Sequence, residues 1–235
     1  MTRHREPSFQ DELRRATPLL VAIPLLVLVW WGVGVLVIHS RIDGWDVDAE
    51  QWLAEHRRAW LDRATEVATW AAESIPVITI TVVAVLVTLK LTDRWRAPLF
   101  IALAVGGEKL VYLFASLLVR RSRPPVPTIG SSYATSSFPS GHVGSAICLY
   151  GALAIVIGAW SRRWAAVAGL AVAALVAVVV GASRMYDGFH YPSDVVAGTI
   201  NGTSWLLLTW LVLRPLRPDP ATLPRPAPTG QPIAG

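Results

Sequence analysis

Six long apolar runs constrain this chain more than any other feature of its sequence. Each run is 17 to 22 residues long, close to the ~20 apolar residues that a helix needs to cross a bilayer. Overall, 53% of the residues are hydrophobic and 16% are charged, and the mean hydropathy of +0.47 is too high for an ordinary soluble domain. The pattern predicts an all-α integral membrane bundle of six transmembrane helices, at residues 19–38, 75–91, 98–119, 142–160, 165–182 and 195–213.

The segments around these runs divide the chain into two tails and a core. Residues 1–17 are polar and are expected to form a cytoplasmic N-terminal tail, and residues 18–213 form the six-span unit. Residues 214–235 are rich in proline and are expected to be a disordered cytoplasmic tail. We expect no cleavable signal peptide, because the first apolar run is long enough to span and lacks an obvious small-residue cleavage site.

The segment after the first run, residues 41–70, mixes acidic residues with tryptophans. On a helix, Trp52, His56 and Trp60 would share one face. Because tryptophan favours the headgroup level of a membrane, this segment is predicted to be an interfacial helix. The alternative is a plain connector with aromatic anchors.

The distribution of basic residues predicts the orientation in the membrane. An even number of spans places both termini on one side, together with the basic links near residues 90–96 and 162–163. Twelve lysines and arginines lie on that side and eight on the other. The positive-inside rule therefore places both termini in the cytoplasm of a multi-pass cell (plasma) membrane protein. The net charge of +5 is then a topological signal, not a footprint for nucleic acid.

One polar stretch between two apolar runs, residues 183–194, reads S-R-M-Y-D-G-F-H-Y-P-S-D. Pro192 is expected to open a helix, which places Asp194 in the first helical turn, close to His190. A histidine oriented by a carboxylate, with Arg184 nearby, is typical of a nucleophile or general base that acts on an anion. The alternative is a polar connector that ends in a capped helix.

The six-span topology brings this stretch to the same face as two other polar clusters. All three fall on the extracytoplasmic side. Backbone N–H groups at the start of the fourth span can donate to a phosphate, and arginine forks bind phosphate oxygens. We therefore expect an oxyanion site built from Arg120, Arg121, Arg123 and Pro124; Pro139, Ser140, Gly141 and His142; and Arg184, His190 and Asp194.

These residues resemble the motifs of the membrane branch of the type 2 phosphatidic acid phosphatase and vanadium haloperoxidase superfamily. Its three motifs are K-x6-R-P, P-S-G-H and S-R-x5-H-x3-D. The sequence 139–142 matches the second motif in full, and 183–194 matches the third with both spacings intact. Only the end of the first motif is present, as Arg123-Pro124. The motif core therefore spans residues 116–194.

The chain departs from the first motif at its lysine, whose position is held by Ser116. Lys109 lies two helical turns earlier, about 10 Å away along the axis, which is too far to replace the lysine directly. Arg120 or Arg121 could supply its charge instead, and Arg121 is preferred because of its place beside the loop. Glu108 and Lys109 themselves are expected either to line a path to the site or to pair within the bundle.

The resemblance implies a catalytic mechanism. His190 would attack phosphorus to form a phosphohistidine, and Asp194 would orient its ring. His142 would protonate the leaving oxygen and then activate water. The substrate phosphate would be bound by Arg123, Arg184, Ser140, Gly141 and Arg121. The resemblance implies no cofactor and no metal, and the lone Cys148 allows neither an intrachain disulfide nor a thiolate metal cluster.

The function implied by the resemblance is hydrolysis of a lipid phosphate or diphosphate by a metal-independent membrane phosphatase. Polyprenyl diphosphate, phosphatidic acid and phosphatidylglycerol phosphate are the candidate substrates, and no nucleic-acid partner is expected. Two alternatives stay open. The same residues would serve a lipid phosphotransferase, and the serine at position 116 would suit a non-catalytic lipid-binding or transport protein with a degenerate site.

Overall fold

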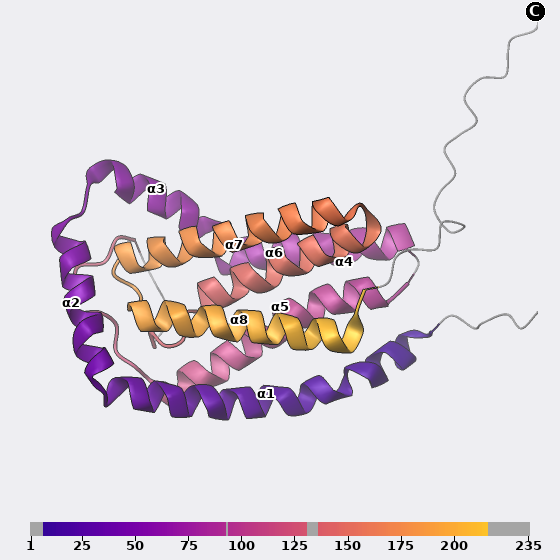
Figure 1. Cartoon of the computed structure of the whole chain (residues 1–235), viewed down its shortest axis with the longest axis horizontal. Helices are drawn as coiled ribbons and strands as arrows, with labels where there is room; N and C mark the ends of the chain where they lie inside the picture. The colour runs from indigo at the N-terminus through magenta and orange to yellow at the C-terminus, as the bar shows by residue number, and fades with distance from the viewer. Residues whose placement is uncertain (1–6, 93, 131–135, 216–235) are drawn as a thin grey trace, which may run out of the picture.

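The computed structural model describes residues 7–92, 94–130 and 136–215, and over these residues the chain forms eight α-helices and no strand. Six stretches are long and apolar enough to cross a membrane, with α3 and α4 counted together as one. This confirms the predicted six-span helical bundle (Figure 1). Residues 216–235 of the predicted C-terminal tail lie outside the described residues. The helices are α1 (Phe9–Ile38), α2 (Arg41–Glu55), α3 (Ala59–Trp70), α4 (Ser74–Thr92), α5 (Arg96–Val119), α6 (Gly141–Trp160), α7 (Arg163–Tyr186) and α8 (Pro192–Leu213).

Helix α1 begins at Phe9, well before the first predicted span. Ser8 Oγ accepts a hydrogen bond from the Asp11 N–H at 3.3 Å, and Asp11 Oδ2 accepts one from the Ser8 N–H at 2.9 Å. This reciprocal pair satisfies donors at the start of the helix. Glu12 then pairs with Arg96 at the start of α5, with 2.7 Å between Oε1 and Nη2. Residues 9–17 are therefore continuous with the membrane helix, and the boundary expected at residue 18 falls inside α1.

Two helices, α2 and α3, stand where the sequence predicted one interfacial helix. The chain breaks between them at residues 56–58, where no proline or glycine marks the break. Figure 1 shows α2 lying across one end of the bundle, beside the end of α1 and the start of α8. Trp45, Trp52 and Trp60 are 58–71% exposed, as expected for surface helices whose tryptophans contact lipid headgroups.

Helix α6 lies at the centre of the bundle and packs against α5, α7 and α8. The interior contains the carboxylate of Glu108 of α5, which is fully buried. Its carboxylate accepts hydrogen bonds from Ser145 Oγ of α6 at 3.1 Å and from Asn201 Nδ2 of α8 at 3.4 Å. Glu108 therefore pairs with neighbouring helices inside the bundle, as buried polar groups in membranes generally do.

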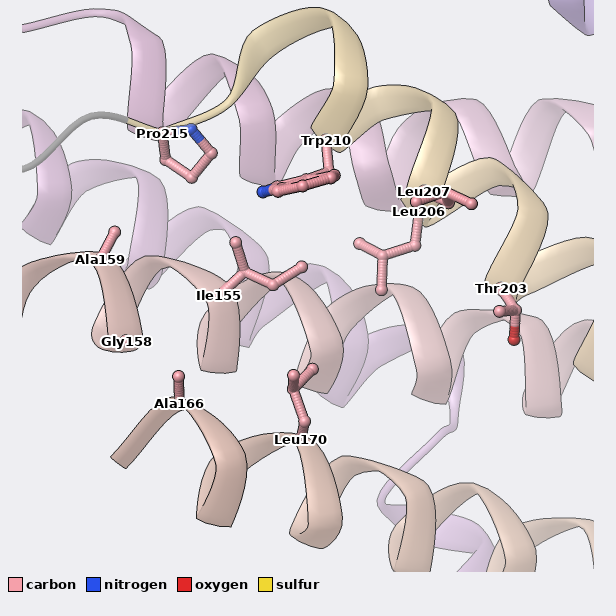
Figure 2. Close-up of a pocket in the computed structure, with 10 residues that line it drawn as sticks. All are labelled: Ile155, Gly158, Ala159, Ala166, Leu170, Thr203, Leu206, Leu207, Trp210 and Pro215. Atoms are coloured by element: carbon pink, nitrogen blue, oxygen red, sulfur yellow. The ribbon is translucent and has the colours of Figure 1, made fainter. Parts of the chain in front are cut away.

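An apolar cavity of about 520 Å³ lies between the later turns of α6 and α8 and the start of α7 (Figure 2). Ile155, Leu170 and Trp210 are among its apolar lining residues, and Thr203 also lines it. The cavity lies at the far end of α6 and α8 from the polar segments described below, so it takes no part in their chemistry.

Candidate active site

The three polar segments predicted to converge lie at one end of the bundle, where α5 and α7 end and α6 and α8 begin (Figure 1). Backbone and side-chain hydrogen bonds join them directly. The Ser140 N–H donates to the Asp194 carbonyl oxygen at 2.9 Å. Arg123 Nη1 donates to the Phe189 carbonyl oxygen at 2.7 Å. Residues far apart in the sequence thus form one compact cluster.

The start of α8 positions part of this cluster. Pro192 opens the helix, as predicted, and Asp194 Oδ2 accepts a hydrogen bond from the Tyr191 N–H at 2.9 Å. Gly198, one turn further along, packs against the loop before α6. A Cβ atom at this position would lie 2.4 Å from the Ser140 carbonyl oxygen. The glycine therefore permits the close approach that brings Ser140 and Asp194 together.

His190 is 3% exposed and is oriented by the loop that precedes α6. Its Nδ1 lies 2.6 Å from the Ser137 carbonyl oxygen, so Nδ1–H donates and Nε2 carries the lone pair. The Asp194 carboxylate was expected to orient this ring, but its Oδ2 lies 3.8 Å from Nδ1, beyond hydrogen-bond distance. Burial lowers the pKa of His190, opposed by Asp194. The histidine is thus held as a neutral imidazole with a free Nε2.

His142 lies in the first turn of α6, with its ring centroid 6.5 Å from that of His190. Its Nε2 lies 3.4 Å from Oε1 of Glu73, a residue in the turn between α3 and α4. The Glu73 carboxylate therefore contacts the His142 ring from outside the three motif segments. Glu73 was not predicted as a site residue, because no motif contains it and several other acidic residues precede the second span.

Arg184 and Arg123 both lie close to the ring of Phe189. The guanidinium carbon of Arg184 is 4.1 Å from the centroid of the Phe189 ring, and that of Arg123 is 5.5 Å from it. Arg184 is 2% exposed, although no carboxylate hydrogen-bonds to it among the described residues. Burial lowers the pKa of Arg123, but arginine remains protonated in proteins. The two arginines therefore concentrate positive charge beside the two histidines.

Four predicted site residues each keep a buried polar atom without a hydrogen-bond partner in the described part of the chain. These atoms are Ser140 Oγ, Arg184 Nε, Arg121 Nε and, apart from its 3.4 Å contact with Glu73, His142 Nε2. Buried polar atoms are normally hydrogen-bonded, so their common lack of a partner fits a site that awaits an oxyanion. The first N–H groups of α6, at Gly141 and His142, add further donors because the first turn of a helix leaves them free.

Arg121 is where the structure departs from the predicted site. Its guanidinium lies in a cluster of carboxylates and is 2% exposed. Nη1 lies 2.7 Å from Asp194 Oδ1, and Nη2 lies 2.7 Å from Asp43 Oδ1 and 2.8 Å from Asp46 Oδ2. Burial lowers the pKa of Arg121 and these carboxylates raise it, with a net rise. Arg121 was expected to bind the substrate phosphate, whereas in the structure both of its terminal nitrogens bind carboxylates.

The position of the missing motif lysine carries no charge in the structure. Ser116 Oγ donates to the Leu113 carbonyl oxygen at 2.9 Å, within α5. Lys109 extends over Tyr112, with Nζ 5.7 Å from the ring centroid. The positive charge located at the site therefore comes from Arg123 and Arg184. Among the described residues, no three His, Cys, Asp or Glu side chains are grouped to hold a metal ion.

Comparison with known protein families places the second half of the chain in a described family. A family described as the PAP2 superfamily matches residues 97–218, just over half of the chain. The matched region contains the P-S-G-H segment, the 183–194 stretch and Arg123, and it leaves out α1 to α4.

Named relatives agree with this match. An undecaprenyl-diphosphatase of Sulfolobus acidocaldarius is 31% identical over 135 residues, which cover 56% of this chain and 59% of that protein. Phosphatidylglycerophosphatase B of Bacillus subtilis is 34% identical over 119 residues, or 48% of this chain and 55% of that protein. The chain thus spans little more than half the length of the relatives it matches.

A solved structure shares the fold. The crystal structure of a transmembrane PAP2-type phosphatidylglycerolphosphate phosphatase from Bacillus subtilis superposes with a TM-score of 0.70 at 22% identity. The superposition covers 80% of this chain and 92% of that one. The similarity therefore extends beyond residues 97–218 to most of the helical bundle.

Proposed function

The chain belongs to the PAP2 superfamily, and from that premise we propose that it is a membrane phosphatase that hydrolyses a lipid phosphate or diphosphate. The observation that carries the proposal is the pair of buried, unpartnered polar atoms Ser140 Oγ and Arg184 Nε. They are buried beside His190, whose Nε2 is left free by the Ser137 contact. A phosphate placed among them would satisfy the donors and meet a nucleophile.

The proposed reaction has two steps. In the first, Nε2 of His190 attacks phosphorus, the bond from phosphorus to the lipid oxygen breaks, and His142 gives that oxygen a proton. In the second, His142 takes a proton from water, whose oxygen attacks the phosphohistidine and releases phosphate. Asp194 stabilises the positive charge that His190 carries between the two steps, and Arg184 neutralises charge on the phosphoryl oxygens.

The proposed substrates are polyprenyl diphosphate, phosphatidic acid and phosphatidylglycerol phosphate. Support comes from the named relatives, which are an undecaprenyl-diphosphatase and a phosphatidylglycerophosphatase. The location adds to this, because the site lies beside α2, whose exposed tryptophans suit the headgroup level. A lipid tail could remain in the bilayer while its phosphate reaches the arginines.

We also propose that the six spans, residues 18–213, form one phosphatase unit in the plasma membrane. Its termini would be cytoplasmic and its site extracytoplasmic, as the distribution of basic residues predicts. Cysteine labelling tests the orientation, since the native Cys148 is buried. A cysteine placed at the exposed Asp48 of α2 should react in intact cells with a membrane-impermeant maleimide. Labelling that requires permeabilised cells would reverse the proposed orientation.

Phosphate release by the purified protein in detergent, with EDTA present, tests the activity. The panel would contain the three candidate lipids, and the variants would be His190→Ala and, as a matched control, His39→Ala at the exposed end of α1. We expect release that is lost in the first variant and kept in the second. Release that persists in His190→Ala would contradict the phosphohistidine mechanism. No release of phosphate from any of the lipids would contradict the proposed function.

A further inference from the structure

Helix α2 presents a row of carboxylates to the active-site end of the bundle. Asp43, Asp46 and Glu50 are spaced three and four residues apart, so they share one helical face. Asp46 and Glu50 are 3% and 1% exposed, whereas Asp48, on another face of the same helix, is exposed. Burial raises the pKa of Glu50 to about 8, so this residue is largely neutral at pH 7. The charge of the row therefore comes from Asp43 and Asp46.

Arg121 connects this row to the start of α8. Its Nη2 is shared by Asp43 and Asp46 of α2, and its Nη1 by Asp194 and Ser193 of α8, at 2.7 and 2.8 Å. One guanidinium thus binds α2 through Nη2 and α8 through Nη1. The residues that it binds lie more than seventy positions from Arg121 in the sequence.

Asp46 also contacts α8 without the arginine. Its Oδ1 accepts a hydrogen bond from the Ser193 N–H at 3.0 Å, and its Oδ2 accepts one from the Ser193 hydroxyl. A carboxylate at this position caps the first turn of α8 and interacts favourably with the helix dipole. Asp46 therefore fixes the start of α8 directly, and Arg121 fixes the next residue, Asp194.

The two oxygens of Asp194 are consequently held by different partners. Oδ1 is held by Arg121, and Oδ2 by the Tyr191 N–H, which leaves Oδ2 facing His190 Nδ1 at 3.8 Å. Loss of the bond to Oδ1 would let the carboxylate rotate away from His190. Displacements of about 1 Å at a catalytic group can reduce a rate about 100-fold.

From these contacts we propose that Asp46 and Arg121 are positioning residues, which hold the Asp194 carboxylate in place beside the ring of the catalytic His190. The inference rests on the proposed phosphatase function for its effect on rate. Neither residue touches the substrate: Arg121 is enclosed by three carboxylates and by the Tyr191 ring, 4.0 Å from its guanidinium carbon. An incoming phosphate would be repelled by those carboxylates. Helix α2 lies outside the family match at residues 97–218, so this support for the site comes from the other part of the chain.

The kinetic test compares Asp46→Asn with Asp48→Asn, which removes a carboxylate from an exposed position of the same helix. For phosphate release from a single lipid substrate, we expect Asp46→Asn to lower kcat by about 10- to 100-fold and to leave KM within about twofold, while Asp48→Asn matches the wild type. Arg121→Lys should resemble Asp46→Asn, because one ammonium cannot replace a guanidinium that serves α2 and α8 together. A raised KM with an unchanged kcat would overturn the proposal and assign Arg121 to substrate binding.

Hydrogen–deuterium exchange tests the proposal without any activity. If Asp46 holds the start of α8, the amides of residues 191 and 193–196 should exchange at least about tenfold faster in Asp46→Ala than in Asp48→Ala. Exchange that is equal in the two variants would overturn the inference, whatever the kinetics show. A wild-type protein that releases no phosphate would refute the proposed function instead, and the exchange result would still decide the role of Asp46.

Discussion

The buried Glu108 offers a test of how the interior of the bundle is held together. Its carboxylate receives hydrogen bonds from Ser145 of α6 and Asn201 of α8. Substitution by leucine removes the acceptor and introduces an apolar side chain of similar size. Substitution by glutamine keeps one carbonyl acceptor and removes the ionisable group. The two variants therefore separate the hydrogen bonds from the charge.

The expected magnitude follows from the partners that each variant leaves behind. Ser145 Oγ keeps a second acceptor, the Gly141 carbonyl oxygen at 2.6 Å, so Asn201 is the group that loses its partner. Hydrogen bonds between transmembrane helices contribute about 0.6 kcal/mol on average and up to about 1.7 kcal/mol. We therefore expect Glu108→Leu to lower the free energy of unfolding by about 1–2 kcal/mol. Glu108→Gln should change it by less than about 0.5 kcal/mol.

Unfolding in mixed detergent micelles, followed by tryptophan fluorescence, measures these differences. The double variant Glu108→Leu/Asn201→Leu completes a mutant cycle, and its loss should be smaller than the sum of the two single losses. If the Glu108→Leu variant were as stable as the wild type, the hydrogen bonds to Glu108 would not stabilise the bundle and the reasoning would be refuted. Phosphate release gives the second measurement: a KM for Glu108→Gln raised more than about fivefold would show that Glu108 lines a path for substrate, the alternative that the sequence left open.

Three further predictions concern the site itself. Burial lowers the pKa of His190, so the neutral nucleophile persists to acidic pH. The acid limb of the pH profile of kcat/KM should therefore lie below pH 6.5, the ordinary pKa of histidine. An acid limb above that value would contradict the burial argument. Glu73→Gln should lower kcat about tenfold, since the general acid loses its charge partner, and an unchanged rate would exclude that role. Gly198→Ala should lower the free energy of unfolding by about 1–3 kcal/mol, because its Cβ would meet the Ser140 carbonyl oxygen at 2.4 Å. Thermal unfolding measures this loss against Gly32→Ala, where no atom lies within 4 Å.

Features with a local cause were predictable from the sequence. Apolar runs long enough to cross a bilayer gave the six spans, and the order of those spans placed the three polar segments at one end. Pro192 and Asp194 marked the start of α8, because their preference for the first helical turn depends only on neighbouring backbone. By contrast, the break between α2 and α3 carries no proline or glycine, and it was missed.

Features with a distant cause were not predictable. Arg121 was assigned to phosphate by its place beside the first motif, but its partners Asp43 and Asp46 lie more than seventy residues away on α2. The hydrogen bond of His190 goes to a backbone carbonyl, that of Ser137. Every residue has such a group, so a sequence pattern cannot single one out. Glu73 likewise became a candidate only once α4 was packed against α6.

The carboxylates of α2 also limit how far this catalytic end can be transplanted. Consider a chimera that took residues 97–218 from this chain and its first helices from a relative without carboxylates at the positions of Asp43 and Asp46. Its Arg121 guanidinium would keep one of its three carboxylates, and the first turn of α8 would lose the cap on Ser193. Exchanges between relatives should therefore keep the α2 carboxylates together with the motif segments.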